Sequence, residues 1–115
     1  MALAGLMAMV SAPAMAGDIA AGRELARLHC TRCHIVGDLN TVSIGSTPSF
    51  QTMVKSDKDY QQTFLAFYAR RPHPAFVRIE GIPPLTDLPS PIAPIHLTLP
   101  EVEDIAAFAA TLKVE

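Results

Sequence analysis

Three side chains able to bind a metal or react with a cofactor lie within five positions: Cys30, Cys33 and His34, in the sequence Cys-Thr-Arg-Cys-His. Two thiols one helical turn apart can add to the two vinyl groups on one edge of a haem, and the adjacent imidazole is then held beneath the iron. We therefore expect one haem c, attached covalently through Cys30 and Cys33, with His34 as the proximal iron ligand.

Other uses of this cysteine pair explain less of the motif. A disulfide between Cys30 and Cys33 would close a very short loop and would contribute little stability through chain entropy. A redox-active Cys-x-x-Cys is expected between a strand and a helix, and no such pattern surrounds these residues. Zinc needs about four ligands, and the chain has only two cysteines. Haem attachment also accounts for the histidine that follows.

The first 16 residues are predicted to be a signal peptide that is removed on export. Residues 1–10 carry no charge, and Ala14-Met15-Ala16 fits the small-x-small pattern of a cleavage site, so the mature chain should begin at Gly17. The apolar run is shorter than the roughly 20 residues that span a bilayer, so no transmembrane anchor is expected in the mature chain. We expect a periplasmic or otherwise exported protein.

Two alternatives remain for this segment. No Lys or Arg precedes the apolar run, which leaves open a true start upstream of Met1. An apolar N-terminal helix that belongs to the fold is the other interpretation.

Composition indicates one globular domain over residues 17–115. The chain has 115 residues, of which 50% are hydrophobic and 17% charged. The net charge is -2 and no run of Lys or Arg is present, so nucleic acid is not an expected partner. Acidic residues are scattered without paired carboxylates, which gives no indication of acid–base catalysis.

Two helices are predicted at the ends of the domain. Asp18 can cap the first helix, whose apolar spacing continues to His29. Gly22 inside this helix is explained by close backbone contact with another helix. At the other end, Thr98 and Glu101 form a capping box for the last helix. Its apolar face should contain Val102, Ile105, Ala109 and Leu112, with Phe108 beside them.

The middle of the chain is predicted to be less regular. Residues 35–47 should form a loop, followed by a short apolar stretch that ends near Val54. Ser56-Asp57-Lys58-Asp59 resembles a capping box for a third helix, which Pro72 would stop. This helix would present an aromatic stripe made of Tyr60, Phe64, Phe67 and Tyr68.

Residues 72–100 contain eight of the ten prolines. Such a density excludes a helix or a central strand. Interspersed apolar residues indicate an ordered, extended wrapping loop. The expected fold is all-α, with no convincing strand.

The sequence resembles class I (monohaem) cytochromes c in three places: Gly17-Asp18-x-x-x-Gly22-Arg23, Cys30-x-x-Cys33-His34 and Leu97-Thr98-x-x-Glu101-x-x-Asp104-Ile105-Ala106-Ala107-Phe108. The resemblance covers nearly the whole mature chain and is weakest between residues 72 and 95. It implies a small cytochrome c fold, with the first and last helices crossing near Gly22 and Phe108 and the Pro-rich loop over the haem. It also implies that the Pro48 carbonyl accepts a hydrogen bond from His34 and so contributes to the cofactor site.

The sequence departs from this family at the sixth iron ligand, which is normally a methionine from a loop before the last helix. Two possible positions hold Phe76, in Pro-His-Pro-Ala-Phe, and Ile92, and neither side chain can bind iron. His96, just before the last helix, is our candidate, and His73, Met53 or a vacant position are the alternatives. For either histidine, an ordinary role in a surface loop is also open.

We expect a one-electron carrier, not an enzyme, because the haem itself would perform the redox chemistry. Its partners would be redox proteins such as an exported dehydrogenase or a respiratory complex, or it would be a subunit of such a dehydrogenase. The missing methionine motivates an alternative, a haem that binds CO or NO or acts as a weak peroxidase. The reduction potential, the individual partners and the oligomeric state do not follow from the sequence.

Overall fold

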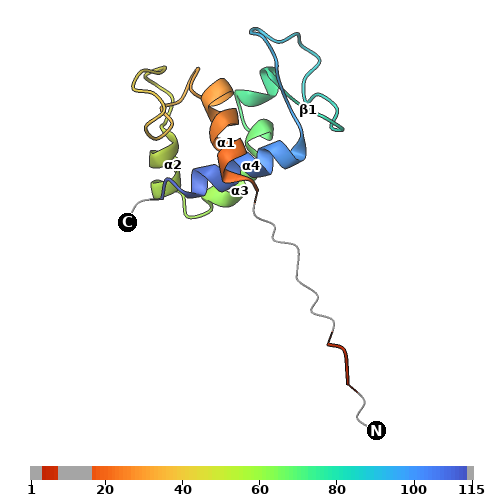
Figure 1. Cartoon of the computed structure of the whole chain (residues 1–115). Helices are drawn as coiled ribbons and strands as arrows, with labels where there is room; N and C mark the ends of the chain where they lie inside the picture. The colour runs from red at the N-terminus through yellow and green to blue at the C-terminus, as the bar shows by residue number, and fades with distance from the viewer. Residues whose placement is uncertain (1–3, 8–16, 114–115) are drawn as a thin grey trace.

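The structure is a computed structural model that describes residues 4–7 and 17–113. Its described part is mostly helical (Figure 1), which is compatible with a small cytochrome c fold. The helices are α1 (Ile19–Leu25), continued by the π-helical η1 (Ala26–Cys30), then α2 (Phe50–Ser56), α3 (Tyr60–Leu65) and α4 (Leu99–Ala110). Two short 3-10 turns follow α3, η2 (Phe67–Ala69) and η3 (His73–Ala75). No helix within the described residues has the length and apolar character needed to cross a membrane.

The first helix is fixed to the last at its N-terminus. The Asp18 carboxylate accepts a hydrogen bond of 3.0 Å from the backbone N–H of Ala21, so the predicted cap of α1 is confirmed. The backbone N–H of Asp18 donates in turn to the Asp104 carboxylate of α4 at 2.7 Å. These two bonds set the position at which α1 starts on α4.

The backbones of α1 and α4 are in contact at Gly22, which confirms the expected close approach of this glycine to another helix. A Cβ atom placed at Gly22 would lie 1.9 Å from the carbonyl oxygen of Asp104 and 2.9 Å from the backbone nitrogen of Ile105. The nearest atoms are therefore not those of Phe108, which lies one turn further along α4 and is buried in the core. Because Gly22 has no side chain, the backbone of α4 can approach the backbone of α1 directly at this position.

The Pro-rich segment contains a small sheet, so the expectation of no strand was wrong. Strand β1 (Val77–Ile79) pairs in parallel with β2 (Ile95–Leu97), in the register Val77↔Ile95 and Ile79↔Leu97. In each strand the two outer side chains are buried and the middle one is more exposed. Neither strand contains a proline, so both can form ladder hydrogen bonds. The strands lie at the two ends of the loop and close it against the helices.

The core lies between the helices and this sheet. The aromatic stripe faces it: Phe64 is buried, and Tyr60, Phe67 and Tyr68 are partly buried against the same cluster. The buried apolar residues are Ala26, Val36, Phe50, Val54, Phe64, Val77, Ile79, Ile95, Leu97, Val102, Ile105, Phe108 and Ala109.

The capping box expected at Ser56 does not form. Ser56 is the last residue of α2, and its hydroxyl donates to the Thr52 carbonyl. The Asp57 carboxylate instead accepts from the Thr63 hydroxyl at 2.6 Å and from the Asp59 backbone N–H at 2.8 Å. These hydrogen bonds, with that from Thr63 the larger effect, lower the pKa of Asp57.

The capping box of α4 is confirmed and gives a first testable prediction. The Thr98 hydroxyl accepts from the Glu101 backbone N–H at 3.2 Å, and the Glu101 carboxylate accepts from the Thr98 backbone N–H at 2.9 Å. Thr98→Ala should lower the free energy of unfolding by about 1 kcal/mol, because one end of this reciprocal pair is lost. Denaturant unfolding measures this loss of stability. Thr98→Ser keeps the hydroxyl, so its free energy of unfolding should fall much less. Equal losses of stability in both variants would contradict the role of the cap.

Candidate haem site

The cysteine-histidine motif begins at the last turn of the first helix. The backbone N–H of Thr31 donates to the Ala26 carbonyl at 3.1 Å, which gives the turn before it a π-helical width. The N–H groups of Cys33 and His34 then both donate to the Cys30 carbonyl, at 3.1 and 2.8 Å. This tight turn places the two cysteines and the histidine next to the end of one rigid element. The π-helical turn, a feature often found at functional sites, is not evident from the sequence.

Neither cysteine is in a disulfide, and both are partly exposed. Burial, followed by the neighbouring Cys33, raises the pKa of the Cys30 thiol to about 12, so this group remains S–H at neutral pH. Across the described ranges, no three Cys, His, Asp or Glu side chains converge on a point that could hold a metal ion. The geometry of the motif suits thiols and an imidazole that bind different parts of one large cofactor.

The imidazole of His34 is oriented by a backbone carbonyl. Its Nδ1 atom lies 2.6 Å from the carbonyl oxygen of Pro48. This carbonyl is the hydrogen-bond partner of His34 that the family resemblance implies. A carbonyl only accepts, so Nδ1 carries the hydrogen and Nε2 keeps a lone pair for a metal. The Phe50 ring packs edge-on against the imidazole, with ring centres 5.4 Å apart, and Phe64 packs against Phe50 at 4.9 Å. The Pro48 carbonyl, Phe50 of α2 and Phe64 of α3 together hold the His34 imidazole in place.

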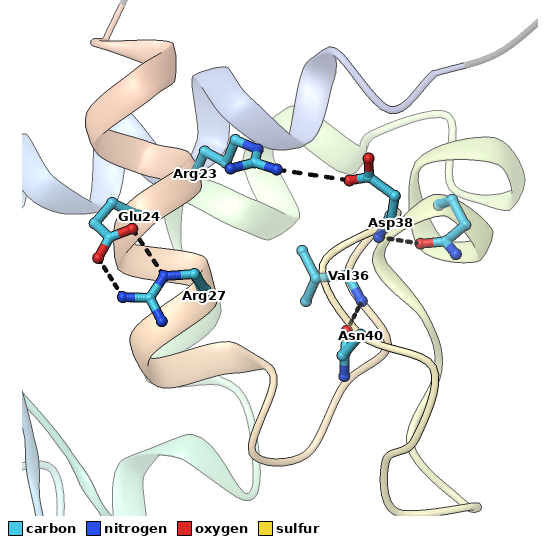
Figure 2. A network of polar contacts seen from close by, with 8 residues as sticks. Arg23, Glu24, Arg27, Val36, Asp38 and Asn40 are labelled. Atoms are coloured by element: carbon cyan, nitrogen blue, oxygen red, sulfur yellow. Dashed lines mark hydrogen bonds and ion pairs between the residues drawn. The ribbon is translucent and has the colours of Figure 1, made fainter.

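The amide side chain of Asn40 organises the loop after the motif (Figure 2), and that of Gln51 accepts a further hydrogen bond from the Gly37 backbone N–H at 2.9 Å. The side-chain oxygen of Asn40 accepts from the Val36 backbone N–H at 2.9 Å. Its nitrogen donates to the carbonyls of His34 at 2.9 Å and of Val42 at 3.1 Å. The sequence predicts only a turn here, because the partners of a side-chain amide depend on how the loop folds back. Asn40 is thus a positioning residue for the backbone of His34.

Removing this amide should loosen the loop. Asn40→Ala leaves the His34 and Val42 carbonyls and the Val36 N–H without their partner, so we expect the free energy of unfolding to fall by about 2 kcal/mol. Denaturant unfolding of the purified protein measures the loss. Thr41→Ala, a change at the exposed neighbouring residue, is the matched control and should have little effect. Similar stability of the two variants would show that Asn40 does not organise the loop.

Charged side chains near this loop are exposed, and they contribute little to holding it. Arg23 of α1 reaches toward Asp38 at 3.9 Å (Figure 2), with side chains 52% and 93% exposed. The other pair, Glu24 and Arg27, lies on the outer surface of α1 and η1. Such exposed pairs contribute little to stability, because solvent screens them. Amide and backbone hydrogen bonds therefore hold the loop.

His73 lies beside His34. It opens η3, and its ring is parallel to that of His34 within 4°, with ring centres 6.3 Å apart. Its Nδ1 atom lies 2.8 Å from the Arg70 carbonyl oxygen. Burial lowers the pKa of His73, with a smaller contribution from His34 in the same direction and an opposing one from the Arg70 carbonyl. The ring is therefore neutral at neutral pH.

The other residues considered for the sixth position lie in different surroundings. His96 is exposed on β2 opposite Arg78, and within the described residues it has no ring contact with His34. Met53 is partly buried against the hydrophobic core, and Ile92 is exposed. Phe76 packs against His73, with ring centres 5.9 Å apart. Of the two candidate histidines, His73 and His96, the structure brings only His73 close to the His34 ring.

These side chains fit a haem. Two thiols lie next to an imidazole whose Nε2 is free, and apolar and aromatic residues surround the imidazole. Comparison with known proteins gives one informative match. The chain is 30% identical over 107 residues to Cytochrome c-552 of Bradyrhizobium diazoefficiens, which covers 93% of this chain and 86% of that protein. No family model matches the chain, and no solved structure matches it.

Proposed function

Because the chain belongs to the c-type cytochromes, we propose that it is an exported class I cytochrome that carries single electrons on one covalently attached haem c. Cys30 and Cys33 would each hold the haem through a thioether, formed when the S–H adds across a vinyl group. His34 would bind the iron through Nε2. The observation that carries this proposal is the His34 imidazole, held by the Pro48 carbonyl at 2.6 Å immediately after two thiols that form no disulfide.

The residues around His34 would tune the cofactor rather than catalyse a reaction. A bound haem supplies the one-electron redox chemistry. The Pro48 carbonyl keeps the hydrogen on Nδ1 and makes Nε2 a stronger donor. Phe50 and Phe64 exclude water from one side of the imidazole. No acid–base role is assigned to any residue, in keeping with a carrier that is not an enzyme.

Features of the fold support the class I assignment. The closest approach of α1 and α4 at Gly22 is what crossing terminal helices require. The Pro-rich segment, residues 72–100, begins with η3 and so places His73 beside His34. We propose that this segment covers the haem.

Export is proposed from the N-terminal segment. Leu6 and Met7 are 96% and 93% exposed, which a helix belonging to the core would not allow. From Gly17 onward the chain is packed: a Cβ at Gly17 would lie 2.5 Å from the Glu103 carbonyl oxygen. The predicted cleavage site at residues 14–16 lies outside the described residues. A signal peptide over residues 1–16 and a mature domain from Gly17 fit these observations, with a periplasmic or other exported location.

The partners would be other redox proteins, such as an exported dehydrogenase or a respiratory complex. The net charge of -2 and the absence of a basic stripe argue against nucleic acid. The CO- or NO-binding alternative gains no support, because a second imidazole lies beside the proximal one.

Spectroscopy and voltammetry of the purified mature protein test this function. The haem should resist acid–acetone extraction, show the pyridine spectrum of a haem with both vinyl groups saturated, and give one reversible one-electron wave. Extractable haem, or haem that exchanges no electrons with the electrode or with any exported redox protein, would contradict the proposal.

A further inference from the structure

The two possible positions for the sixth ligand of the family hold Phe76 and Ile92 in this chain. The structure places a different candidate at the site. The His73 and His34 rings have their centres 6.3 Å apart and lie in planes that differ by only 4°.

This separation is the one expected for two imidazoles on opposite sides of one metal. A ring nitrogen lies about 2 Å from a bound first-row transition metal, and the ring centre lies roughly 1 Å further out, so two opposed rings have their centres about 6 to 6.5 Å apart. Two imidazoles in direct face-to-face contact would be much closer. The observed distance between the ring centres of His34 and His73, 6.3 Å, agrees with this value.

Both rings also use the same nitrogen atom, Nδ1, for a hydrogen bond to a backbone carbonyl. Nδ1 of His34 donates to the Pro48 carbonyl at 2.6 Å, and Nδ1 of His73 donates to the Arg70 carbonyl at 2.8 Å. Because a carbonyl cannot donate, both rings carry a hydrogen on Nδ1, and Nε2 is the nitrogen that can offer a lone pair to a metal. Histidines that bind a metal through one ring nitrogen usually donate the other ring N–H to a carbonyl or carboxylate in this way.

The surroundings of His73 hold it in place before any metal binds. Its backbone N–H donates to the same Arg70 carbonyl at 3.0 Å, so ring and backbone share one anchor. Phe67 packs edge-on against the ring, with centres 5.1 Å apart, and Phe76 packs at 5.9 Å. Phe76 therefore supports the ring of His73 at the place where other members of the family would supply a methionine.

We propose that His73 is the distal axial ligand, with its Nε2 bound to the iron opposite Nε2 of His34, so that the protein carries a bis-histidine haem. This inference rests on the proposed function, because it requires the covalently bound haem. It assigns the sixth position to His73 in place of the candidate His96. Since an axial methionine raises the potential relative to other ligands, it also gives the carrier a lower reduction potential than a His/Met cytochrome.

Electron paramagnetic resonance and near-infrared magnetic circular dichroism of the ferric holoprotein test this ligand set. The wild type should be low-spin, with the signature of two nearly parallel imidazoles and without the charge-transfer band of a thioether ligand. His73→Ala should keep its covalent haem, lose the low-spin signal, bind CO in the ferrous state and recover the low-spin signal on addition of imidazole. His73→Met, which again offers a ligand, should raise the reduction potential.

Matched variants separate the other candidates. His96→Ala and Met53→Leu should leave the wild-type spectrum unchanged. An unaltered spectrum in both His73 variants, or loss of the low-spin signal in His96→Ala or Met53→Leu, would overturn the assignment of His73 while leaving the covalent haem in place. A wild-type protein that carries no covalent haem would overturn the proposed function as well, so the two failures are distinguishable.

Discussion

Replacing both Cys30 and Cys33 with alanine is expected to abolish covalent haem attachment completely. Cys30 ends η1 and Cys33 lies on the turn that follows it, next to His34, and neither cysteine is in a disulfide. His34 alone would hold a haem only by coordination, so the cofactor would be lost on denaturation. The measurement is a denaturing gel stained for haem, with the wild type beside the double variant.

Two kinds of variant make this result specific. Single replacements of Cys30 or Cys33 should keep haem through one thioether and shift the absorption of the reduced form, because one vinyl group stays unsaturated. Arg32→Ala changes an exposed residue of the same turn and should keep the full haem stain. Stained bands from the double variant, or loss of stain in Arg32→Ala, would count against attachment through these two thiols.

Gly22→Ala is expected to cause the largest loss of stability. The new Cβ would lie 1.9 Å from the Asp104 carbonyl oxygen, and that neighbour is backbone, so α1 and α4 would have to separate. Alanine favours a helix by about 1 kcal/mol relative to glycine, but the overpacking should outweigh this and lower the free energy of unfolding by about 3 kcal/mol. The measurement is denaturant unfolding of the holoprotein, together with the yield of holoprotein.

Gly45→Ala is the matched control. No atom lies within 4 Å of a Cβ placed there, so its stability should stay near that of the wild type. Equal stability of Gly22→Ala and Gly45→Ala would show that the helices do not meet closely at Gly22.

The features predicted correctly depend on short stretches of sequence. Asp18 and the pair Thr98 and Glu101 each cap a helix through partners three residues away, and such contacts follow from local order. The glycine at position 22 predicts a close helix contact because few other reasons explain a glycine inside a helix. The exact partner on α4 does not follow from the sequence, because it depends on how the two helices are placed.

The features that were missed depend on distant partners. β1 and β2 are three residues each and lie 18 positions apart in register, too short for alternation to identify them. Asn40 gains its role only when the loop folds over the motif. The sequence favours His96, which lies just before the last helix, over His73, although both lie in the Pro-rich segment. Only the fold brings one of them to His34.

Intact-mass spectrometry of the exported wild-type protein under denaturing and reducing conditions is the decisive measurement of covalent haem attachment. We expect a single species that begins at Gly17 and is heavier than the polypeptide by one haem, with the added mass on the peptide that contains Cys30 and Cys33. A species with the mass of the bare polypeptide and two thiols available to alkylating reagents would contradict it.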